Sequence, residues 1–223
     1  MAPIISRLSS LGGGGTGGFS FGKRKIPSGV SILPPVLAYS LTSQQNFNSS
    51  NSYDFNLTSN VNDLSKAVTV MMWANISSSQ SEGGGNQSGV IWNWQPPGVS
   101  LPYEGPGMGF TKPGYQFYHY FAGVSNDNNV NVNVQGNTWV HLVWQRNSNN
   151  QVRAWFNGNA LSNYTSQTGN SVSSLNSTHR LGYSIGQYTY SMNGSITDLF
   201  IYKNECYFSN TISIPTRGGG TPF

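Results

Sequence analysis

The sequence predicts an all-β protein, folded as an antiparallel β-sandwich or jelly roll. Short runs of β-branched and aromatic residues recur from residue 67 onward, and clusters of Gly, Pro, Asn and Ser separate them. No stretch of a dozen residues keeps a helical period. Charged residues form only 8% of the 223 residues while aromatic residues form 13%, which is typical of a packed protein with a neutral polar surface.

The runs that predict strands are residues 67–76, 89–94, 115–121, 130–134, 138–146, 151–158, 179–186 and 193–204. Residues 130–134 (VNVNV) alternate strictly between valine and asparagine, as expected of a strand with one buried face. The segment Asn147-Ser148-Asn149-Asn150 separates two of the runs. It predicts a hairpin, because Asn tolerates the positive φ that tight turns demand.

Three segments differ in composition. Residues 1–34 form an extended Gly-rich arm, which contains LGGGGTGGFSFGKRK at residues 11–25. Residues 35–215 hold the predicted strands and form the sandwich, and residues 216–223 form a second Gly-rich tail. A run of glycines has no side chains to bury, so we expect the arm to gain shape only against another surface.

The arm carries the whole positive excess of the chain. Residues 1–25 contain none of the 7 acidic residues and four of the 11 basic ones, which are Arg7, Lys23, Arg24 and Lys25. The rest of the chain is neutral and offers no basic face for nucleic acid. A tethered cationic segment is attracted to an acidic partner surface, and Phe19 and Phe21 can fill pockets there. The alternative is that the arm only adds solubility.

The second half of the chain resembles laminin-G-like and concanavalin A-like jelly-roll domains. WVHLVW at residues 139–144, an Asn-rich turn and VRAWFNG at residues 152–158 are similar to the central hairpin of those domains. LGYSIG at residues 181–186 and NGSITDLFIY at residues 193–202 resemble two of their later strands.

An early strand at residues 68–76 with Trp73 also belongs to that pattern, so the resemblance runs in order over residues 36–214. It implies a concanavalin A-like jelly roll. It also implies that His141 is a packed, hydrogen-bonded structural residue and that Asp198 is a structural aspartate.

Several concanavalin A-like relatives are glycoside hydrolases, so catalysis has to be tested. Their chemistry needs two carboxyl groups about 5 to 10 Å apart, and hydrolases of this fold place Glu-x-Asp-x-x-Glu on one strand. This chain has no such triplet, and Glu82 and Glu104 stand alone in predicted loops. We therefore expect no enzymatic activity and no catalytic residues.

We also expect no metal site and no cofactor. The three histidines are scattered singly, without the spacing of zinc ligands. Asn126-Asp127-Asn128-Asn129 offers oxygen ligands for Ca²⁺, but a single acid in an Asn-rich loop is also the ordinary composition of a turn.

Exposed aromatic rings beside amide side chains are a common way to bind sugars. Trp94 precedes Gln95-Pro96-Pro97, and Tyr103 lies among prolines and glycines, so both are predicted at the surface. Together with Asp127 and Asn128 they are the candidate ligand-binding residues. The other aromatic residues alternate along predicted strands and are assigned to the core.

The arm resembles the start of structural proteins in the virions of tailed phages, especially marine ones. MAPIISRL at residues 1–8, the glycine run and FSFG at residues 19–22 carry this resemblance. It implies a non-enzymatic virion protein that is multimeric in the assembled particle and that its arm fastens to capsid, neck or tail proteins.

The sandwich would then be displayed on the particle as a decoration or tail-associated domain, with host-surface carbohydrate as a candidate ligand. The alternative is a free carbohydrate-binding lectin whose arm is incidental, and a glycoside hydrolase is the third possibility. No apolar run reaches the roughly 18 to 20 residues of a membrane span, and no secretory signal begins the sequence.

Overall fold

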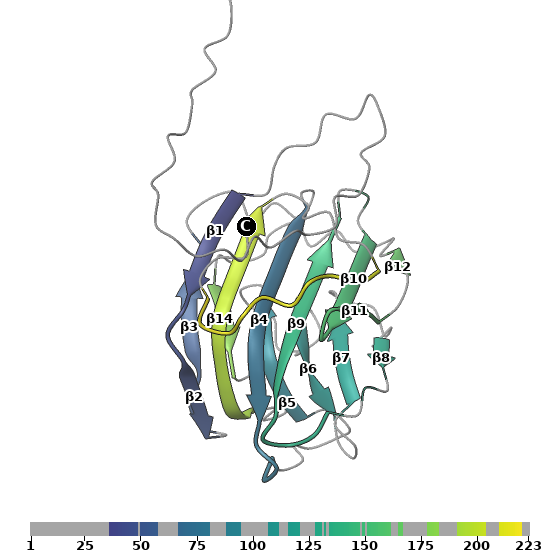
Figure 1. Cartoon of the computed structure of the whole chain (residues 1–223). Coiled ribbons are helices and arrows are strands. Elements are labelled where there is room, and N and C mark those ends of the chain that lie inside the picture. Colours follow the sequence, from purple (N-terminus) through teal and green to yellow (C-terminus); the bar gives the residue numbers. More distant parts are fainter. Residues whose placement is uncertain are drawn as a thin grey trace, which may run out of the picture.

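Two antiparallel β-sheets face each other in the computed structural model, which confirms the sandwich that the sequence predicts (Figure 1). The structure describes residues 36–48, 50–57, 67–80, 88–94, 107–111, 116–120, 128–130, 132, 134–147, 149, 151–161, 165–166, 178–182, 191–203 and 210–219. These ranges contain strands and no helix, so none of their elements is a helix that could cross a membrane. The predicted arm at residues 1–34 lies outside them.

In chain order the strands are β1 (Val36–Leu41), β2 (Gln45–Asn48), β3 (Tyr53–Asn56), β4 (Val68–Ile76), β5 (Ser88–Trp94), β6 (Gly107–Thr111), β7 (Gln116–Tyr120), β8 (Asn128–Val130), β9 (Trp139–Arg146), β10 (Gln151–Phe156), β11 (Asn159–Ala160), β12 (Thr165–Ser166), β13 (Thr178–Leu181) and β14 (Asn193–Lys203). The larger sheet has the order β1-β14-β4-β9-β10-β11, with β2 also pairing β14 and β12 also pairing β10. The smaller sheet has the order β3-β13-β5-β6-β7-β8. The last strand, β14, therefore lies between β1 and β4.

The main core fills the space between the two sheets. Alternate residues of β4 point into it, because successive side chains of a strand face opposite sides: Val68, Val70, Met72, Ala74 and Ile76. Large aromatic side chains of the facing strands are fully buried, and the rings of Trp92 and Trp144 meet across the sandwich with centroids 5.4 Å apart. Each such side chain contributes roughly 1.5–3 kcal/mol to folding by leaving water.

His179 of β13 is buried inside this aromatic core. Its ring stacks against Phe55 and Trp94, with centroid distances of 5.2 and 4.9 Å. Its Nδ1 accepts a hydrogen bond from Trp92 Nε1 at 3.2 Å. Burial lowers the pKa of His179 to about 3, so the ring is neutral at physiological pH.

The predicted hairpin is confirmed between β9 and β10, where Arg146 pairs with Val152. Asn147 caps the turn, because its Oδ1 accepts hydrogen bonds from the backbone N–H groups of Asn149 and Gln151 at 3.0 and 2.9 Å. The Asn-Gly pair after β10 forms a second tight turn, in which both residues have positive φ, 45° and 80°.

The strand predicted over residues 130–134 is correct only for Val130, which ends β8. Val132 and Val134 are not in a strand, and Val134 N donates to Val132 O at 2.8 Å, as in a tight turn. The side chains of Val132 and Val134 still face the core, where Val134 is buried and Val132 is half-buried. Alternation predicted the face of these side chains correctly and the backbone conformation incorrectly.

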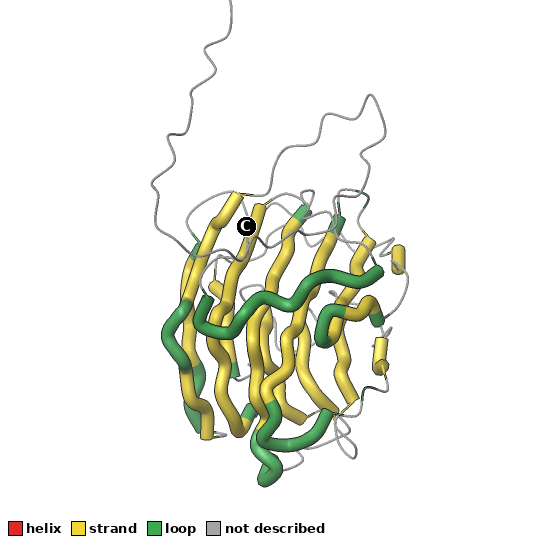
Figure 2. The backbone as a smooth tube through the Cα atoms, viewed as in Figure 1, coloured by secondary structure: helices red, strands yellow, loops and turns green. Residues whose placement is uncertain are grey.

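Residues 210–219, which we call the strap, cross the outer face of the larger sheet (Figure 2). The strap is fixed beside β11, where Ile212 N donates to Gly158 O at 2.8 Å. Ile212 packs into an apolar cluster on that outer face, and the other buried members are Met71, Val143, Trp155, Phe200 and Tyr202. The strap therefore covers an apolar patch on the outer face of the larger sheet.

Candidate functional site

Most residues that the sequence singles out as site candidates lie outside the described part of the chain. This holds for all six attachment candidates, Arg7, Phe19, Phe21, Lys23, Arg24 and Lys25, and also for Tyr103 and Asp127. Asn128 is the first residue of β8, and only its backbone is described. These residues remain predictions.

Trp94 is not a surface residue, which corrects the predicted surface position on which its candidacy as a ligand-binding residue depended. Its side chain is fully buried at the end of β5 and stacks on His179. Trp92 and Trp94 are two positions apart, so both point to the same side of the strand, and that side is the core. The alternation along β5 decides the position of Trp94, and the prolines that follow it in sequence do not.

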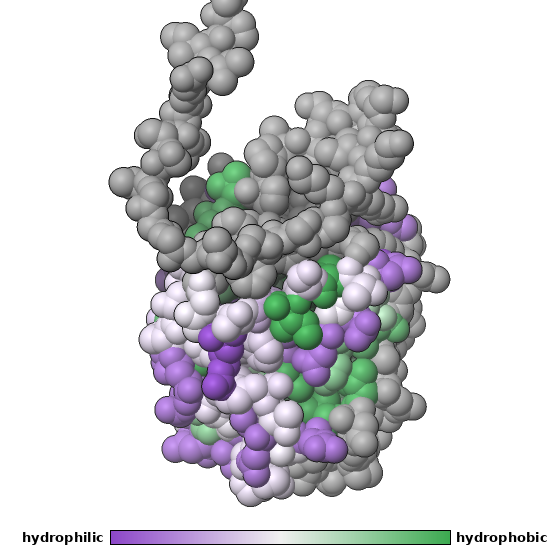
Figure 3. All heavy atoms as spheres, in the orientation of Figure 1, coloured by the Kyte–Doolittle hydropathy of each residue, from purple (hydrophilic) through white to green (hydrophobic). Residues whose placement is uncertain are grey.

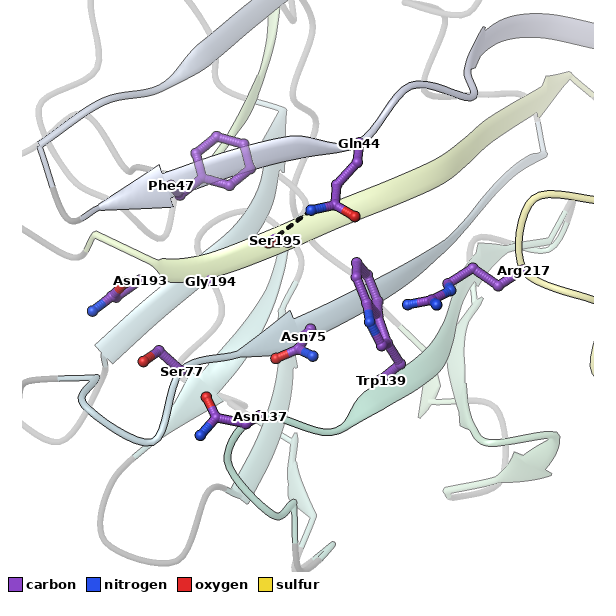
Figure 4. A pocket seen from close by; sticks show the side chains of 10 residues that line it. All are labelled: Gln44, Phe47, Asn75, Ser77, Asn137, Trp139, Asn193, Gly194, Ser195 and Arg217. Atoms are coloured by element: carbon purple, nitrogen blue, oxygen red, sulfur yellow. Dashed lines mark hydrogen bonds between the residues drawn. The ribbon is translucent and has the colours of Figure 1, made fainter.

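A polar groove opens on the outer face of the larger sheet, where β4 ends and where β9 and β14 begin (Figure 4). It has a volume of about 490 Å³ and is lined by Gln44, Phe47, Asn75, Ser77, Asn137, Trp139, Asn193, Gly194, Ser195 and Arg217. The surface over β14 and the neighbouring part of β4 is hydrophilic, and apolar atoms gather toward β10 and β11 (Figure 3). Amides and hydroxyls dominate the lining, which contains one cation and no carboxylate.

The register of the sheet places a row of these residues on one face. Ser195 of β14 lies opposite Asn46 of β2 and opposite Asn75 of β4, and Asn75 lies opposite Trp139 of β9. Residues directly opposite each other in antiparallel strands share a face. Asn46, Ser195, Asn75 and Trp139 therefore form a line across four strands, while neighbours such as Ala74 point into the core.

Hydrogen bonds fix the row at the β2 side of the groove. Asn46 Oδ1 accepts from Ser195 Oγ at 2.8 Å and from Gln44 Nε2 at 2.7 Å. Gln44 Nε2 also lies 3.5 Å from Ser195 Oγ, at the limit of hydrogen bonding. Asn75 makes no side-chain hydrogen bond to the described residues, so its amide is available in the groove.

Two turns fix the far end of the groove. Asn137 has φ of 61° and bonds Ser78 twice, because its Nδ2 donates to Ser78 Oγ at 2.9 Å and its Oδ1 accepts from Ser78 N at 3.1 Å. Asn193 Nδ2 donates to Ser79 Oγ at 3.1 Å. Gly194 keeps the floor of the groove low, since a Cβ at this position would lie 2.1 Å from the backbone oxygen of Asn75.

Trp139 and Arg217 form the opposite wall of the groove. The guanidinium carbon of Arg217 lies 4.4 Å from the centre of the Trp139 ring, within the range of a cation–π contact. Trp139 comes from the start of β9 and is half-buried, whereas Arg217 comes from the strap and is exposed. Figure 4 shows the two side chains directed toward each other over the strands.

Asp198 holds the turn that carries Arg217. Gly219 N donates to Thr216 O at 2.9 Å, and Gly218 has φ of 77°, which the third position of a type II turn requires. Gly218 N donates to Asp198 Oδ2 at 2.6 Å. Asp198 is buried, has a positive φ of 51° and lies at the irregularity in the pairing of β14 with β4.

His141 lies two residues after Trp139 on the same face of β9 and is packed, as the family resemblance implies. Its ring is 5.4 Å from that of Trp73, and burial lowers its pKa to about 4. The expected hydrogen bond is not made at Nδ1, which has no partner among the described residues. Within the described ranges, no group of three His, Cys, Asp or Glu side chains could hold a metal ion.

The sequence did not identify the groove, for a physical reason. Its polar residues come from β4, β14 and the segments beside β2 and β9, which are far apart in the chain. Only the register brings them together, and register is not visible in single strands. The available signal was polar residues beside apolar ones at strand ends, as in Trp73-Ala74-Asn75 near the end of β4 and Asn193-Gly194-Ser195 at the start of β14.

Comparisons with known proteins show the fold alone. No family model matches the sequence, and no curated protein matches it. The binding domain of botulinum neurotoxin serotype D/C has a TM-score of 0.53 and 13% identity, over 78% of this chain and 45% of that one. A mutant of HCR D/C has a TM-score of 0.51 and 14% identity, over 78% of this chain and 45% of that one. The chain thus spans about 45% of the length of these β-sandwich structures, and its fold is consistent with a jelly roll.

Proposed function

We propose that this protein is a non-enzymatic structural component of a phage virion, whose sandwich binds host-surface glycans in the polar groove. Residues 1–34 attach it to capsid, neck or tail proteins. The observation that carries the glycan-binding part is the composition of the groove wall. The attachment part is supported by the sequence of the arm.

The groove offers what a sugar needs. Each sugar hydroxyl both donates and accepts hydrogen bonds, and an amide side chain provides a donor and an acceptor side by side. Asn75, Asn137 and Asn193 supply amides from three separate segments, and Trp139 supplies an aromatic surface beside them. The volume of about 490 Å³ falls in the usual range of about 300–1,000 Å³ for small-molecule sites. The lining is much more polar than in most such sites, which favours a polyhydroxylated ligand.

The groove is also largely pre-formed. The side chains of Asn46, Ser195 and Asn137 are already held by hydrogen bonds within the protein. Binding would therefore cost little free energy for ordering these side chains. This matters for a small ligand such as a sugar, whose total binding free energy is small. The fold supports the same interpretation, because the neurotoxin domain that it resembles is itself a binding domain.

The carboxylates support a role without catalysis. Asp54 and Asp198 are the acidic residues of the described part, and they lie in different sheets. Asp54 forms an ion pair with Arg180 at 2.5 Å, and Asp198 accepts from Gly218. Neither is a member of a pair flanking the groove, as glycoside hydrolysis requires.

A glycan array probed with the full chain tests the proposal. We expect binding to a defined set of saccharides, and we expect Asn75→Ala to reduce it about tenfold by removing an amide that faces the ligand. Asn159→Ala is the matched control, because Asn159 is exposed on β11 at the far edge of the same sheet. Absence of binding across a broad array would contradict glycan recognition. Incubation with polysaccharides, followed by an assay for new reducing ends, tests the hydrolase alternative.

Attachment to the particle is tested separately. A chain lacking residues 1–25 should bind the same glycans and fail to appear on purified virions, since those residues carry the net positive charge. High salt should release the full chain from particles, because exposed charge pairs are screened. Normal loading of the truncated chain would contradict attachment through the arm.

A further inference from the structure

We infer that the glycan is acidic and that its carboxylate or sulfate group binds the guanidinium of Arg217. This inference rests on the proposed function, because it names the class of saccharide that the groove takes. It starts from the charge of the lining. Arg217 is the one charged residue among the ten, and no carboxylate of the described residues forms an ion pair with it.

The geometry leaves Arg217 able to bind an oxyanion. A guanidinium uses its faces for contact with an aromatic ring and its edges for hydrogen bonding, because all five N–H donors lie in its plane. Arg217 lies over Trp139 at 4.4 Å, so the indole orients the cation without consuming those donors. A carboxylate or a sulfate presents two oxygens that match two parallel N–H groups.

The position of the cation is fixed by the fold. Residues 216–219 form a turn whose Gly218 N–H is held by the buried carboxylate of Asp198. Farther back along the strap, Ile212 is buried in the outer apolar cluster. Arg217 is thus fixed from both sides, by the turn on its own segment and by the ring of Trp139 from β9. A cation built into a groove in this way differs from a surface lysine that moves freely.

The rest of the groove points to a saccharide and away from a simple anion. A free phosphate or sulfate would contact Arg217 and leave the amides of Asn75 and Asn193 unused, although these line the same groove. A saccharide with one charged substituent uses both parts. Its charged group meets Arg217, and its hydroxyls meet the neutral row across β14 and β4.

The experiment compares pairs of ligands that differ only in charge, using the full chain and isothermal titration or a binding array. The pairs are oligogalacturonate with its methyl ester, 3′-sialyllactose with its methyl ester, and a sulfated galacto-oligosaccharide with its unsulfated form. For every pair in which either member binds, we expect the acidic member to bind about tenfold more tightly. Comparing the carboxylated ligands with the sulfated ligand shows which oxyanion is preferred.

Two variants assign the effect to Arg217. Arg217→Gln should bring the ratio of acidic to neutral affinity in each pair close to one, and it should remove the extra salt dependence of the acidic member. Arg217→Lys keeps the charge and loses the planar edge, so we expect an intermediate preference. The melting temperature of each variant checks that the sandwich is intact.

The outcomes separate the two proposals. If neutral and acidic members bind equally, or if Arg217→Gln keeps the preference, the acidic ligand is wrong while glycan binding stands. If no member of any pair binds and the wider array is also silent, glycan binding itself is wrong.

Discussion

Asp198 adopts a backbone conformation that favours glycine and asparagine, with φ of 51° in a position that is 4% exposed. Its carboxylate is partly satisfied by Gly218 N–H, and its Oδ1 has no partner among the described residues. A residue kept in such a strained and desolvated position usually has a specific task. Here the task is to hold the turn that presents Arg217.

Replacing Asp198 separates this positioning role from general stability. Asp198→Asn should preserve binding of acidic saccharides, because asparagine tolerates positive φ and its Oδ1 still accepts from Gly218. Asp198→Ala should lose the preference for the acidic member of each ligand pair, because the turn is released. The ratio of acidic to neutral affinity is the measurement, since a loss of stability alone would lower both. An unchanged ratio in the alanine variant would contradict the positioning role.

The two buried histidines make stability depend on pH. Burial lowers the pKa of His141 to about 4 and that of His179 to about 3, whereas the unfolded chain has a histidine pKa of about 6.5. As the pH falls below about 6.5, the unfolded chain binds protons that the folded chain excludes. Their contribution is therefore complete above about pH 6.5 and is lost progressively as the pH falls toward the folded-state values.

Urea unfolding between pH 6.0 and 4.5 measures this dependence. Each histidine should contribute up to about 1.4 kcal/mol per pH unit to the slope of the unfolding free energy. His179→Gln keeps an acceptor for Trp92 Nε1 and cannot titrate. The unfolding free energy of this variant should therefore depend less steeply on pH than that of the wild-type protein, by the contribution of one histidine. Equal slopes would show that His179 takes up its proton in the folded state.

At the scale of elements, the strap stabilises the larger sheet by covering an apolar patch. Ile212 is 7% exposed in the outer cluster, whereas Ile214, two residues on, is 41% exposed. Ile212→Ala should lower the unfolding free energy by about 2 kcal/mol, at the low end of the range for buried aliphatic residues. Ile214→Ala is the matched control and should change it by less than about 0.5 kcal/mol. Similar losses of unfolding free energy in both variants would contradict a specific packing role for Ile212 in the outer apolar cluster.

The strands that could be predicted are those whose side chains alternate or whose runs are strongly apolar. β4, β9, β10 and β14 are of this kind, and each begins within about one residue of its predicted position. β2 and β3 were missed because each has four residues with one buried phenylalanine, and β6 because its sequence GMGFT is rich in glycine. Short strands are stabilised by their neighbours, so their own sequences contain little signal.

At the scale of the whole molecule, the strands that the structure describes all come from residues 36–203, after the arm. Deleting residues 1–25 should therefore leave the melting temperature within about 2 °C of the full chain's and the circular dichroism spectrum of a β protein. Differential scanning calorimetry measures the first quantity. A large drop in melting temperature would show that the arm packs on its own sandwich, which would weaken the attachment proposal.

The fold class could be predicted from the whole chain, but the candidate site could not. Composition and periodicity describe each strand by itself, and they were sufficient for an antiparallel sandwich. The groove depends on three-dimensional relations: the pairing of Ser195 with Asn46 and with Asn75, and the return of the strap to Trp139. Of the two aromatic residues that the sequence favoured for binding, Trp94 belongs to the core and Tyr103 lies outside the described residues. Trp139 was noted only as part of the hairpin that resembles laminin-G-like domains.

The same ten-residue segment shields the apolar patch and supplies Arg217 to the groove wall. A saccharide bound to the guanidinium would therefore also stabilise the contact between this segment and the sheet. Proteolytic nicking within residues 210–219 should slow when the groove is occupied, because cleavage needs that segment to lift away. Ligand binding and resistance to degradation would then be two results of one contact.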